Sequence, residues 1–242
     1  AGYYLKQLDS DKQNGVVVPA VQGLRSAGNK GQVFAIGPSV KYSTKTGTTF
    51  TTKDQVVAAY NDPSELYSAR TSVVSIENTC NRGGGSTWNR TTVMEITTFA
   101  KSLGLGTHMD GARIFNALIA RNEEPKHWGP LFDSVSICLS KGLGAPVGSV
   151  LVGSTEFIAE ARRVRKRMGG GMRQAGLLAA AGLHALDHHV ERLRDDHARA
   201  KAVSDVLARS AKVETVMPVE TNIVIYVLKR RPVEVLATFN AN

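Results

Sequence analysis

The stretch Ser134-Val-Ser-Ile-Cys-Leu-Ser-Lys-Gly-Leu-Gly-Ala-Pro-Val-Gly-Ser-Val-Leu-Val-Gly153 combines two predicted strands with a glycine-rich turn between them. In its first half apolar residues alternate with small ones, which is typical of a strand that is covered on both faces. Gly142, Gly144 and Gly148 allow the backbone to turn sharply or to approach a ligand closely. Lys141 is therefore expected at the end of a buried strand, at the start of this turn.

Two interpretations of Lys141 follow from its position. No carboxylate lies within several residues of it, and an ammonium group is costly to remove from water. A lysine in such surroundings favours its neutral amine form, which can act as a nucleophile. In the alternative interpretation, the side chain extends from the strand end into solvent. Partner residues elsewhere in the chain have to decide between the two.

The composition indicates a globular protein whose 242 residues suffice for one large α/β domain, with or without an appendage. Hydrophobic residues make up 42% of the chain, and no apolar run reaches the length of a membrane span. Residues 1–6 lack the charged-then-apolar order of a signal peptide. Cys80 and Cys138 do not form a disulfide framework. We therefore expect a cytoplasmic protein with no membrane partner.

The formal net charge of +9 raises the question of nucleic-acid binding. Its densest part is the predicted helical segment Ala161-Arg-Arg-Val-Arg-Lys-Arg167. Aromatic residues make up only 6% of the chain, and none of the common nucleic-acid-binding motifs is present. A small anionic ligand or a solvated helix face explains the cluster equally well. We therefore expect no nucleic-acid partner.

From residue 71 onward the hydrophobic pattern alternates between strand and helix periods. The expected elements are strands at residues 71–76 and 105–109, helices at residues 91–101 and 112–121, and then the strand that leads to Lys141. This order is the signature of a parallel sheet with right-handed crossovers. In such sheets, ligands bind at the carboxyl ends of the strands.

Three of these strands end in polar residues, namely Glu77 with Asn78, Asp110, and Lys141. We expect all three ends at one edge of the sheet. A lysine and an acid brought together there suit pyridoxal phosphate, because its aldehyde condenses with a lysine while a carboxylate keeps its ring nitrogen protonated. Asp110 can also cap the helix that follows it, and both roles are compatible.

Three motifs carry a family resemblance: His108-Met-Asp-Gly-Ala-Arg-Ile-Phe-Asn116, the segment Asp133 to Ser149, and Gly169-Gly-Gly-Met-Arg-Gln-Ala-Gly176. They resemble the low-specificity L-threonine aldolases, which are pyridoxal phosphate enzymes of the aspartate-aminotransferase fold type. The resemblance covers residues 72–207. It implies an α/β chain of fold type I, with a large cofactor-binding domain at residues 1–210 and part of a small domain at residues 211–242.

The resemblance also implies roles for individual residues. Lys141 would form the imine (internal aldimine) with the cofactor, and Asp110 would pair with the pyridine nitrogen. Arg113 would lie beside the cofactor. Arg173, together with Lys166, would hold anionic groups of the cofactor or the substrate, and an arginine fork after three glycines suits that task.

The implied activity is the cleavage of L-threonine or L-allo-threonine to glycine and acetaldehyde by a homo-oligomeric lyase. The alternatives are another pyridoxal phosphate reaction, such as β-elimination or racemisation, or a non-catalytic truncated homologue. The resemblance implies histidines where this chain has Cys80 and, just upstream of the Ala-Arg-Thr segment, Tyr67. Its cofactor-phosphate loop and its substrate-carboxylate arginine have no counterpart that we recognise, so the resemblance implies a truncated or divergent member.

Outside these motifs the expectations are modest. The pattern predicts short strands at residues 15–19 and 32–37 and a capped short helix at residues 52–60. The small-residue helix expected at residues 170–186 would pack in the core or against another subunit. His184 and His188 lie one helical turn apart without an evident third ligand, so we interpret them as helix residues and not as a metal site.

Overall fold

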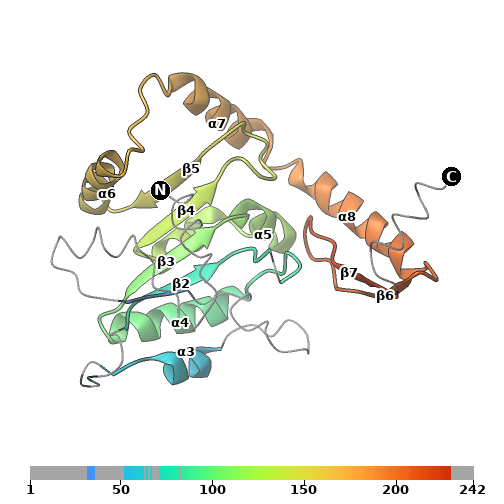
Figure 1. The fold of residues 1–242 in the computed structure, drawn as a ribbon, viewed down its shortest axis with the longest axis horizontal. Helices are drawn as coiled ribbons and strands as arrows, with labels where there is room; N and C mark the ends of the chain where they lie inside the picture. Colours follow the sequence, from blue (N-terminus) through green and yellow to red (C-terminus); the bar gives the residue numbers. More distant parts are fainter. Residues whose placement is uncertain are drawn as a thin grey trace.

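A five-stranded sheet forms the centre of the computed structural model, which describes residues 32–35, 52–62, 64, 66, 71–81 and 83–229 (Figure 1). The strand order is β1-β2-β3-β4-β5. The strands are Gln32–Ala35 (β1), Thr71–Glu77 (β2), Gly106–Gly111 (β3), Ser134–Cys138 (β4) and Ser149–Gly153 (β5). The predicted strand at residues 15–19 lies outside the described residues.

Four of these strands run parallel, and β5 pairs antiparallel with β4. In the register of the parallel pairs, Glu77 lies opposite Asp110, and Asp110 lies opposite Ser136. The carboxyl ends of β2, β3 and β4 therefore meet at one edge of the sheet. The expected α/β architecture with a mainly parallel sheet is confirmed.

Helices connect the strands and extend the chain beyond the sheet. They are Lys53–Ala59 (α3), Arg90–Ser102 (α4), Ile114–Arg121 (α5), Thr155–Arg167 (α6), Gly176–His188 (α7) and Leu193–Ala208 (α8), with short 3₁₀ turns at Pro125–His127 (η2) and Gly129–Leu131 (η3). A two-stranded antiparallel sheet follows, formed by Val213–Val216 (β6) and Tyr226–Leu228 (β7). Figure 1 shows α8 leading away from the main sheet to this pair.

Local signals explain where the helices begin. Asn89 caps α4, because its side chain accepts a hydrogen bond from the Thr91 amide at 2.8 Å. Thr52 and Gln55 form a capping box at the start of α3, and the predicted helix at residues 52–60 is found there. The helix expected at residues 112–121 begins slightly later, at Ile114, because Arg113, with φ −143° and ψ 42°, is the non-helical N-cap residue.

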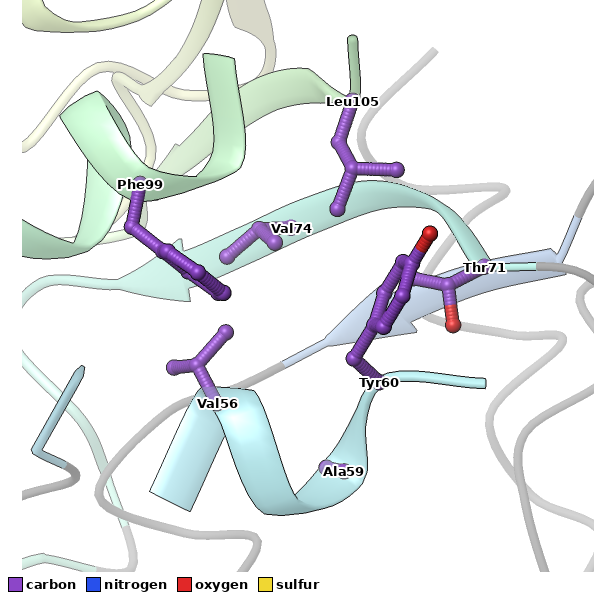
Figure 2. Close-up of a pocket in the computed structure, with 7 residues that line it drawn as sticks. All are labelled: Val56, Ala59, Tyr60, Thr71, Val74, Phe99 and Leu105. Carbon is purple, nitrogen blue, oxygen red and sulfur yellow. The ribbon is translucent and has the colours of Figure 1, made fainter. Parts of the chain in front are cut away.

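The main core lies between one face of the sheet and the helices α4 and α5. Its fully buried members alternate along the strands with residues of the other face, as in Val74 and Ile76 of β2. The short helix α3 completes this core. Figure 2 shows Val56 and Tyr60 from α3 and its C-terminal end facing Val74 and Phe99, around a cavity of about 10 Å³. That space is roughly what one water molecule requires, so the packing here is tight.

The opposite face of the sheet is polar although much of it is buried. Ser75, Ser134 and Ser136 are all more than 90% buried. His108 is paired with Ser75 on one side and with Ser134 on the other. Asp110 follows His108 by two residues and therefore projects from the same face. This face is where the sequence-predicted acid is located.

The apolar residues Val150 and Val152 of β5 are exposed, because β5 is an antiparallel edge strand with no further neighbour among the described residues. The small-residue helix α7 starts at Gly176 and leaves Leu177 82% exposed. Gly182 and Ala185 of the same helix are buried, and Ala185 belongs to a second core cluster, so the helix packs in the core along one side, while a contact of its exposed side with another subunit stays a prediction.

In the described part of the chain, no helix combines the length and the apolar character needed to cross a membrane. The boundary between a large domain at residues 1–210 and a partial small domain at residues 211–242 stays a prediction. The pair β6–β7 follows α8 at that point.

Gly111 at the end of β3 permits the close approach of β4. A Cβ atom at this position would lie 2.6 Å from the backbone oxygen of Ser136. We expect Gly111→Ala to lower the free energy of unfolding by about 1–3 kcal/mol, because backbone cannot move aside as a flexible side chain can. Urea unfolding of the chain measures this value. Gly176→Ala is the matched control, because nothing lies within 4 Å of its added Cβ. Equal losses in both variants would contradict the explanation.

Candidate active site

The candidate site is built at the edge of the sheet where β2, β3 and β4 end. Backbone hydrogen bonds join the first residues after these strands. The amide of Asn78 donates to the Asp110 carbonyl oxygen at 2.9 Å, and the Arg113 amide donates to the Asn78 carbonyl oxygen at 3.2 Å. The segments that carry Glu77, Asp110 and Arg113 are thereby fixed relative to one another.

Lys141 lies in the turn that follows β4 and is half-buried. Within the turn, the Gly144 amide donates to the Lys141 carbonyl oxygen at 2.9 Å, and the Ala145 amide donates to the Leu139 carbonyl oxygen at 3.0 Å. Gly144 has a φ of +72°, which a residue with a side chain rarely adopts. The glycines that the sequence analysis singled out thus shape the turn.

Residues of the helices α5 and α8 and the residue that follows α7 pack against this turn. His189 Nδ1 lies 2.6 Å from the Leu143 carbonyl oxygen. A Cβ on Gly142 would lie 3.0 Å from Leu193 Cδ2 and 3.1 Å from Asn116 Oδ1, so the backbone here is closely packed. Leu143 and Leu193 belong to a second buried apolar cluster, which anchors the turn to the body of the chain.

Glu77 is the carboxyl group whose environment is most informative. Burial raises its pKa, and the nearby Asp110 raises it further, while a hydrogen bond with Cys80 and the charge of Lys141 act in the opposite direction. The carboxyl group of Glu77 therefore interacts with the predicted acid and with the predicted amine. The structure brings Asp110 and Lys141 into one electrostatic neighbourhood, as the interpretation of Lys141 as a site residue requires.

His108 lies behind Asp110 on β3. Burial lowers its pKa, which the neighbouring Asp110 and a hydrogen bond with Ser134 only partly offset. Its Nδ1 atom is 2.8 Å from Ser134 Oγ. The ring is therefore held in a fixed orientation in a largely neutral form near neutral pH. Sequence analysis placed His108 in a family motif but assigned no role to it.

Several buried polar atoms at this edge lack a hydrogen-bond partner among the described residues. They are both amide atoms of Asn78, the hydroxyl oxygen of Thr79 and Nη1 of Arg113. Asn78 and Thr79 are fully buried. Leaving such atoms unpaired is costly, and native proteins rarely tolerate it outside functional sites. These donors and acceptors fit a polar ligand between the strand ends, and pyridoxal phosphate offers the polar groups to pair with them.

Cys80 occupies the position where the resemblance leads one to expect a histidine. It is fully buried, it carries a free thiol, and it forms the hydrogen bond with Glu77 described above. Tyr67 lies outside the described residues. The residue that sequence reasoning undervalued is Glu77, since its position after an apolar strand was the only signal available.

Arg173 and Lys166 are placed elsewhere. Lys166 is exposed near the end of α6, and its Nζ lies 3.4 Å from the position of a Cβ on Gly171. Arg173 is exposed in the connection from α6 to α7 and makes no hydrogen bond or ion pair with any other described residue. Figure 1 shows this connection beyond β5, away from β2 and β3. No hydrogen bond or ion pair of the described chain links either residue to the strand ends that carry Glu77 and Asp110.

The arrangement combines an amine, two carboxyl groups and unpaired polar atoms on a mainly parallel α/β sheet. Such a set can bind an aldehyde-bearing aromatic ligand and can move protons beside it. Among the described residues, no three side chains of histidine, cysteine, aspartate or glutamate gather as metal ligands would. The class of protein that the fold defines is an α/β protein with a mainly parallel sheet, in which a lysine and two acids lie at or just beyond the carboxyl ends of the strands.

Solved structures share this fold. A putative L-allo-threonine aldolase from Listeria monocytogenes superposes with a TM-score of 0.68 at 21% identity, over 78% of this chain and 51% of that one. The threonine aldolase of Leishmania major gives a TM-score of 0.66 at 19% identity, over 79% of this chain and 56% of that one. At these identities the likeness concerns the fold, which is fold type I of the pyridoxal phosphate enzymes.

The sequence defines the family. A model of the beta-eliminating lyase family matches residues 23–231, and the chain belongs to this family. Members of the family depend in general on pyridoxal phosphate.

Named relatives agree with this assignment. The low specificity L-threonine aldolase of Escherichia coli (strain K12) is 46% identical over 166 residues, covering 69% of this chain and 48% of the enzyme. The probable low-specificity L-threonine aldolase 2 of Arabidopsis thaliana is 46% identical over 171 residues, covering 70% and 48%. The chain thus spans about half the length of these relatives.

The raised pKa of Glu77 predicts a pH-dependent stability. A carboxyl group that holds its proton more tightly when folded stabilises the fold at low pH, and this contribution is lost as the pH rises through the raised pKa. Above the ordinary range of about 4 to 4.5, Glu77→Gln should therefore become increasingly stable relative to the unaltered chain. Urea unfolding between about pH 4.5 and 8 would measure the difference.

Glu95→Gln on the exposed side of α4 provides the control, because this carboxyl group lies at the surface. The free energy of unfolding of the Glu95→Gln variant should differ from that of the unaltered chain by a constant amount over the same pH range. If Glu77→Gln also differed by a constant amount, Glu77 would not hold its proton more tightly in the folded chain, and the environment described for it would be wrong.

Proposed function

We propose that this chain carries the cofactor site of a pyridoxal phosphate-dependent aldehyde-lyase that cleaves L-threonine and L-allo-threonine to glycine and acetaldehyde. The observation that carries the proposal is the joint position of Lys141, Asp110 and the unpaired buried atoms of Asn78 and Thr79 at one sheet edge. The family and the names of its relatives indicate the reaction. Because the chain spans about half of those relatives, the activity of the whole protein is part of the proposal.

Four residues would hold the cofactor. Lys141 would bind it covalently through its amine, and Asp110 would pair with the ring nitrogen. The amide of Asn78 and the buried guanidinium nitrogen of Arg113 are available for its remaining polar groups or for those of the substrate. When bound, the protonated pyridine ring supplies an electron sink for the negative charge that develops at the substrate Cα atom.

The protein's own part is to position, to exclude water and to move protons. The charge of Lys141 acts on the carboxyl group of Glu77, so that a carboxyl group with a raised pKa belongs to the electrostatic surroundings of the amine. The hydroxyl proton of a β-hydroxy amino acid must leave as the Cα–Cβ bond breaks. The buried strand ends keep this region largely out of water, which strengthens each of these electrostatic interactions.

Arg173 and Lys166 are proposed to bind anionic groups of the cofactor or the substrate. Since no hydrogen bond or ion pair of the described chain links them to the strand ends, we propose that they act in a homo-oligomer, at a contact between copies. The exposed apolar residues Leu177 and Leu183 of α7, close to Arg173 in sequence, favour such a contact. We also propose a cytoplasmic location, since Cys80 and Cys138 are both free thiols.

β-Elimination is a second candidate reaction, and the description of the matching family as beta-eliminating lyases favours it. The same lysine and acid serve both reactions, because each begins with binding of an amino acid at the same site. Product analysis distinguishes them. Threonine gives glycine and acetaldehyde in the aldol cleavage, whereas an elimination from serine gives pyruvate and ammonia.

The direct test of cofactor binding is the visible absorbance of the chain mixed with pyridoxal phosphate. We expect a yellow band that borohydride fixes to the peptide containing Lys141, and acetaldehyde release when threonine is added. Lys141→Ala should lose the band, the fixed label and the cleavage. Lys101→Ala, an exposed lysine on α4, should retain all three. A band that survives in Lys141→Ala would reject Lys141 as the attachment site, and a chain without any band would reject the proposed function.

Asp110→Asn tests the second half of the pair. The variant should still take up the cofactor, because Lys141 is intact, but threonine cleavage should fall by about 100-fold or more when the ring nitrogen loses its ionised partner. Absorbance reports the first quantity and a coupled acetaldehyde assay reports the second. Undiminished cleavage in Asp110→Asn would show that another group fills this role.

A further inference from the structure

The loop that follows β2 is held in place by a segment far away in the sequence. Residues 83–88 carry three consecutive glycines, of which Gly84 and Gly85 have φ values of +71° and +73°. The hydroxyl group of Thr221 donates a hydrogen bond of 2.6 Å to the Gly85 carbonyl oxygen. Thr221 is fully buried and lies in the connection between β6 and β7. A Cβ on Gly85 would come within 2.4 Å of the Thr221 hydroxyl oxygen, so glycine permits this contact.

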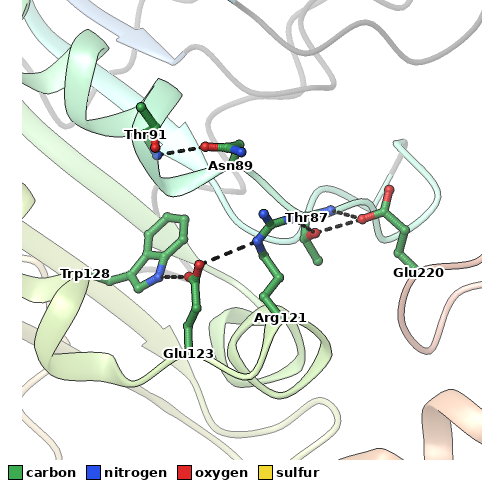
Figure 3. A network of polar contacts seen from close by, with 7 residues as sticks. All are labelled: Thr87, Asn89, Thr91, Arg121, Glu123, Trp128 and Glu220. Carbon is green, nitrogen blue, oxygen red and sulfur yellow. Dashed lines mark hydrogen bonds and ion pairs between the residues drawn. The ribbon is translucent and has the colours of Figure 1, made fainter.

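Glu220 makes a second contact with the same loop. One of its carboxylate oxygens accepts hydrogen bonds from the Thr87 amide at 3.0 Å and from the Thr87 hydroxyl group at 2.7 Å. Figure 3 shows Thr87 between Glu220 and Arg121, and Arg121 Nη1 donates to the Thr87 hydroxyl oxygen at 3.3 Å. Arg121 in turn lies 3.7 Å from Glu123, which accepts a hydrogen bond from the indole of Trp128. The loop is thus tied to the main core on one side and to the C-terminal segment on the other.

The loop passes this restraint to the candidate site through two further hydrogen bonds. The Gly85 amide donates to the Cys80 carbonyl oxygen at 3.0 Å. The indole Nε1 of Trp88 donates to the Glu77 carbonyl oxygen at 2.9 Å. Residues 77–80 are therefore restrained at both ends by these two hydrogen bonds. Within this segment, the Asn78 amide donates a hydrogen bond to the Asp110 carbonyl oxygen, as described above. The path from Gly85 to Asp110 consists of the backbone from Cys80 to Asn78 and the backbone hydrogen bond at each end of it.

We propose that Thr221 and Glu220 are positioning residues for the cofactor site, which act through residues 83–88 on the segment from Glu77 to Cys80. The proposal rests on the proposed function only in naming what the site binds. It assigns a task to the C-terminal part of the described chain that neither residue's sequence context indicates. The contacts that carry it join residues more than 130 positions apart, since the Thr87–Glu220 separation is 133 residues.

The chemistry of the two contacts suggests their relative weight. Thr221 and the Gly85 carbonyl oxygen are paired out of water, so loss of the hydroxyl group leaves a buried acceptor unsatisfied. Glu220 is exposed, and its carboxylate can be replaced there by water. Thr221 should therefore dominate the restraint, with Glu220 making a smaller contribution.

Thr221→Val and Thr221→Ser form a matched pair for the test. Valine keeps the shape but lacks the hydroxyl group, and serine keeps the hydroxyl group. We expect Thr221→Val to raise the dissociation constant for pyridoxal phosphate about tenfold, as the loss of one buried hydrogen bond would. Thr221→Ser should bind with nearly the original affinity. Glu220→Ala removes an exposed side chain and should raise the dissociation constant by a smaller factor. This variant keeps the proposal testable if Thr221→Val fails to fold.

Hydrogen exchange of the chain without cofactor gives a readout that is independent of activity. Backbone amides of residues 78–88 should exchange faster in Thr221→Val and in Glu220→Ala, while those of β3 and α4 stay unchanged. Asp205→Asn is the control for altering a surface charge in the same region, because it breaks only the Lys201–Asp205 ion pair on α8. It should change neither exchange nor affinity.

A double-mutant cycle tests whether the path runs through Trp88. Thr221→Val combined with Trp88→Phe should weaken cofactor binding by less than the product of the single effects, because both substitutions release the same segment. Multiplicative effects would overturn the path. Unchanged exchange at residues 78–88 in both Thr221→Val and Glu220→Ala would overturn the proposal itself. If the unaltered chain binds no pyridoxal phosphate, the proposed function fails, and the exchange measurement still decides whether these residues restrain the segment.

Discussion

The parallel pairing of β2, β3 and β4 is the constraint on which the rest of the site depends. It places Glu77 beside Asp110 and Asp110 beside Ser136, with side chains of paired residues on the same face. The close packing of Gly111 against the backbone of β4 maintains this register at the edge where the strands end. Lys141, Asp110, Asn78 and Arg113, which we propose as holders of the cofactor, all lie at these strand ends or in the turns that follow them.

The groups of the candidate site lower the stability of the fold, as is common at functional sites. Two carboxyl groups lie near each other, an amine lies beside them, and buried amide and hydroxyl groups of Asn78 and Thr79 lack partners among the described residues. None of these features stabilises the fold, and the large apolar core on the opposite face of the sheet offsets them. One face of the sheet thus carries the polar groups and the other face the stabilising core, as expected for a ligand site on a stable scaffold.

Support for the site comes from two directions. The turn with Lys141 rests on the apolar cluster that includes Leu143 and Leu193, and the loop after β2 rests on the segment with Glu220 and Thr221. The lysine and the strand ends that face it are therefore held by different parts of the chain. Both supports come from residues within the part of the chain that the beta-eliminating lyase model matches.

The sequence by itself determined the order of strands and helices, the parallel sheet, and the strand-end positions of Asp110 and Lys141, because hydrophobic periodicity and turn residues are local signals. It did not determine the antiparallel direction of β5, since alternation carries no direction. The sequence also predicted Glu77 at the same sheet edge, but only the tertiary structure decided that burial and Asp110 raise the pKa of its carboxyl group, and that Arg173 forms no hydrogen bond or ion pair within the described chain. It also decided the contact between Thr221 and Gly85. These features depend on pairs of residues far apart in sequence, and no local pattern records which distant residue fills the space beside a given side chain.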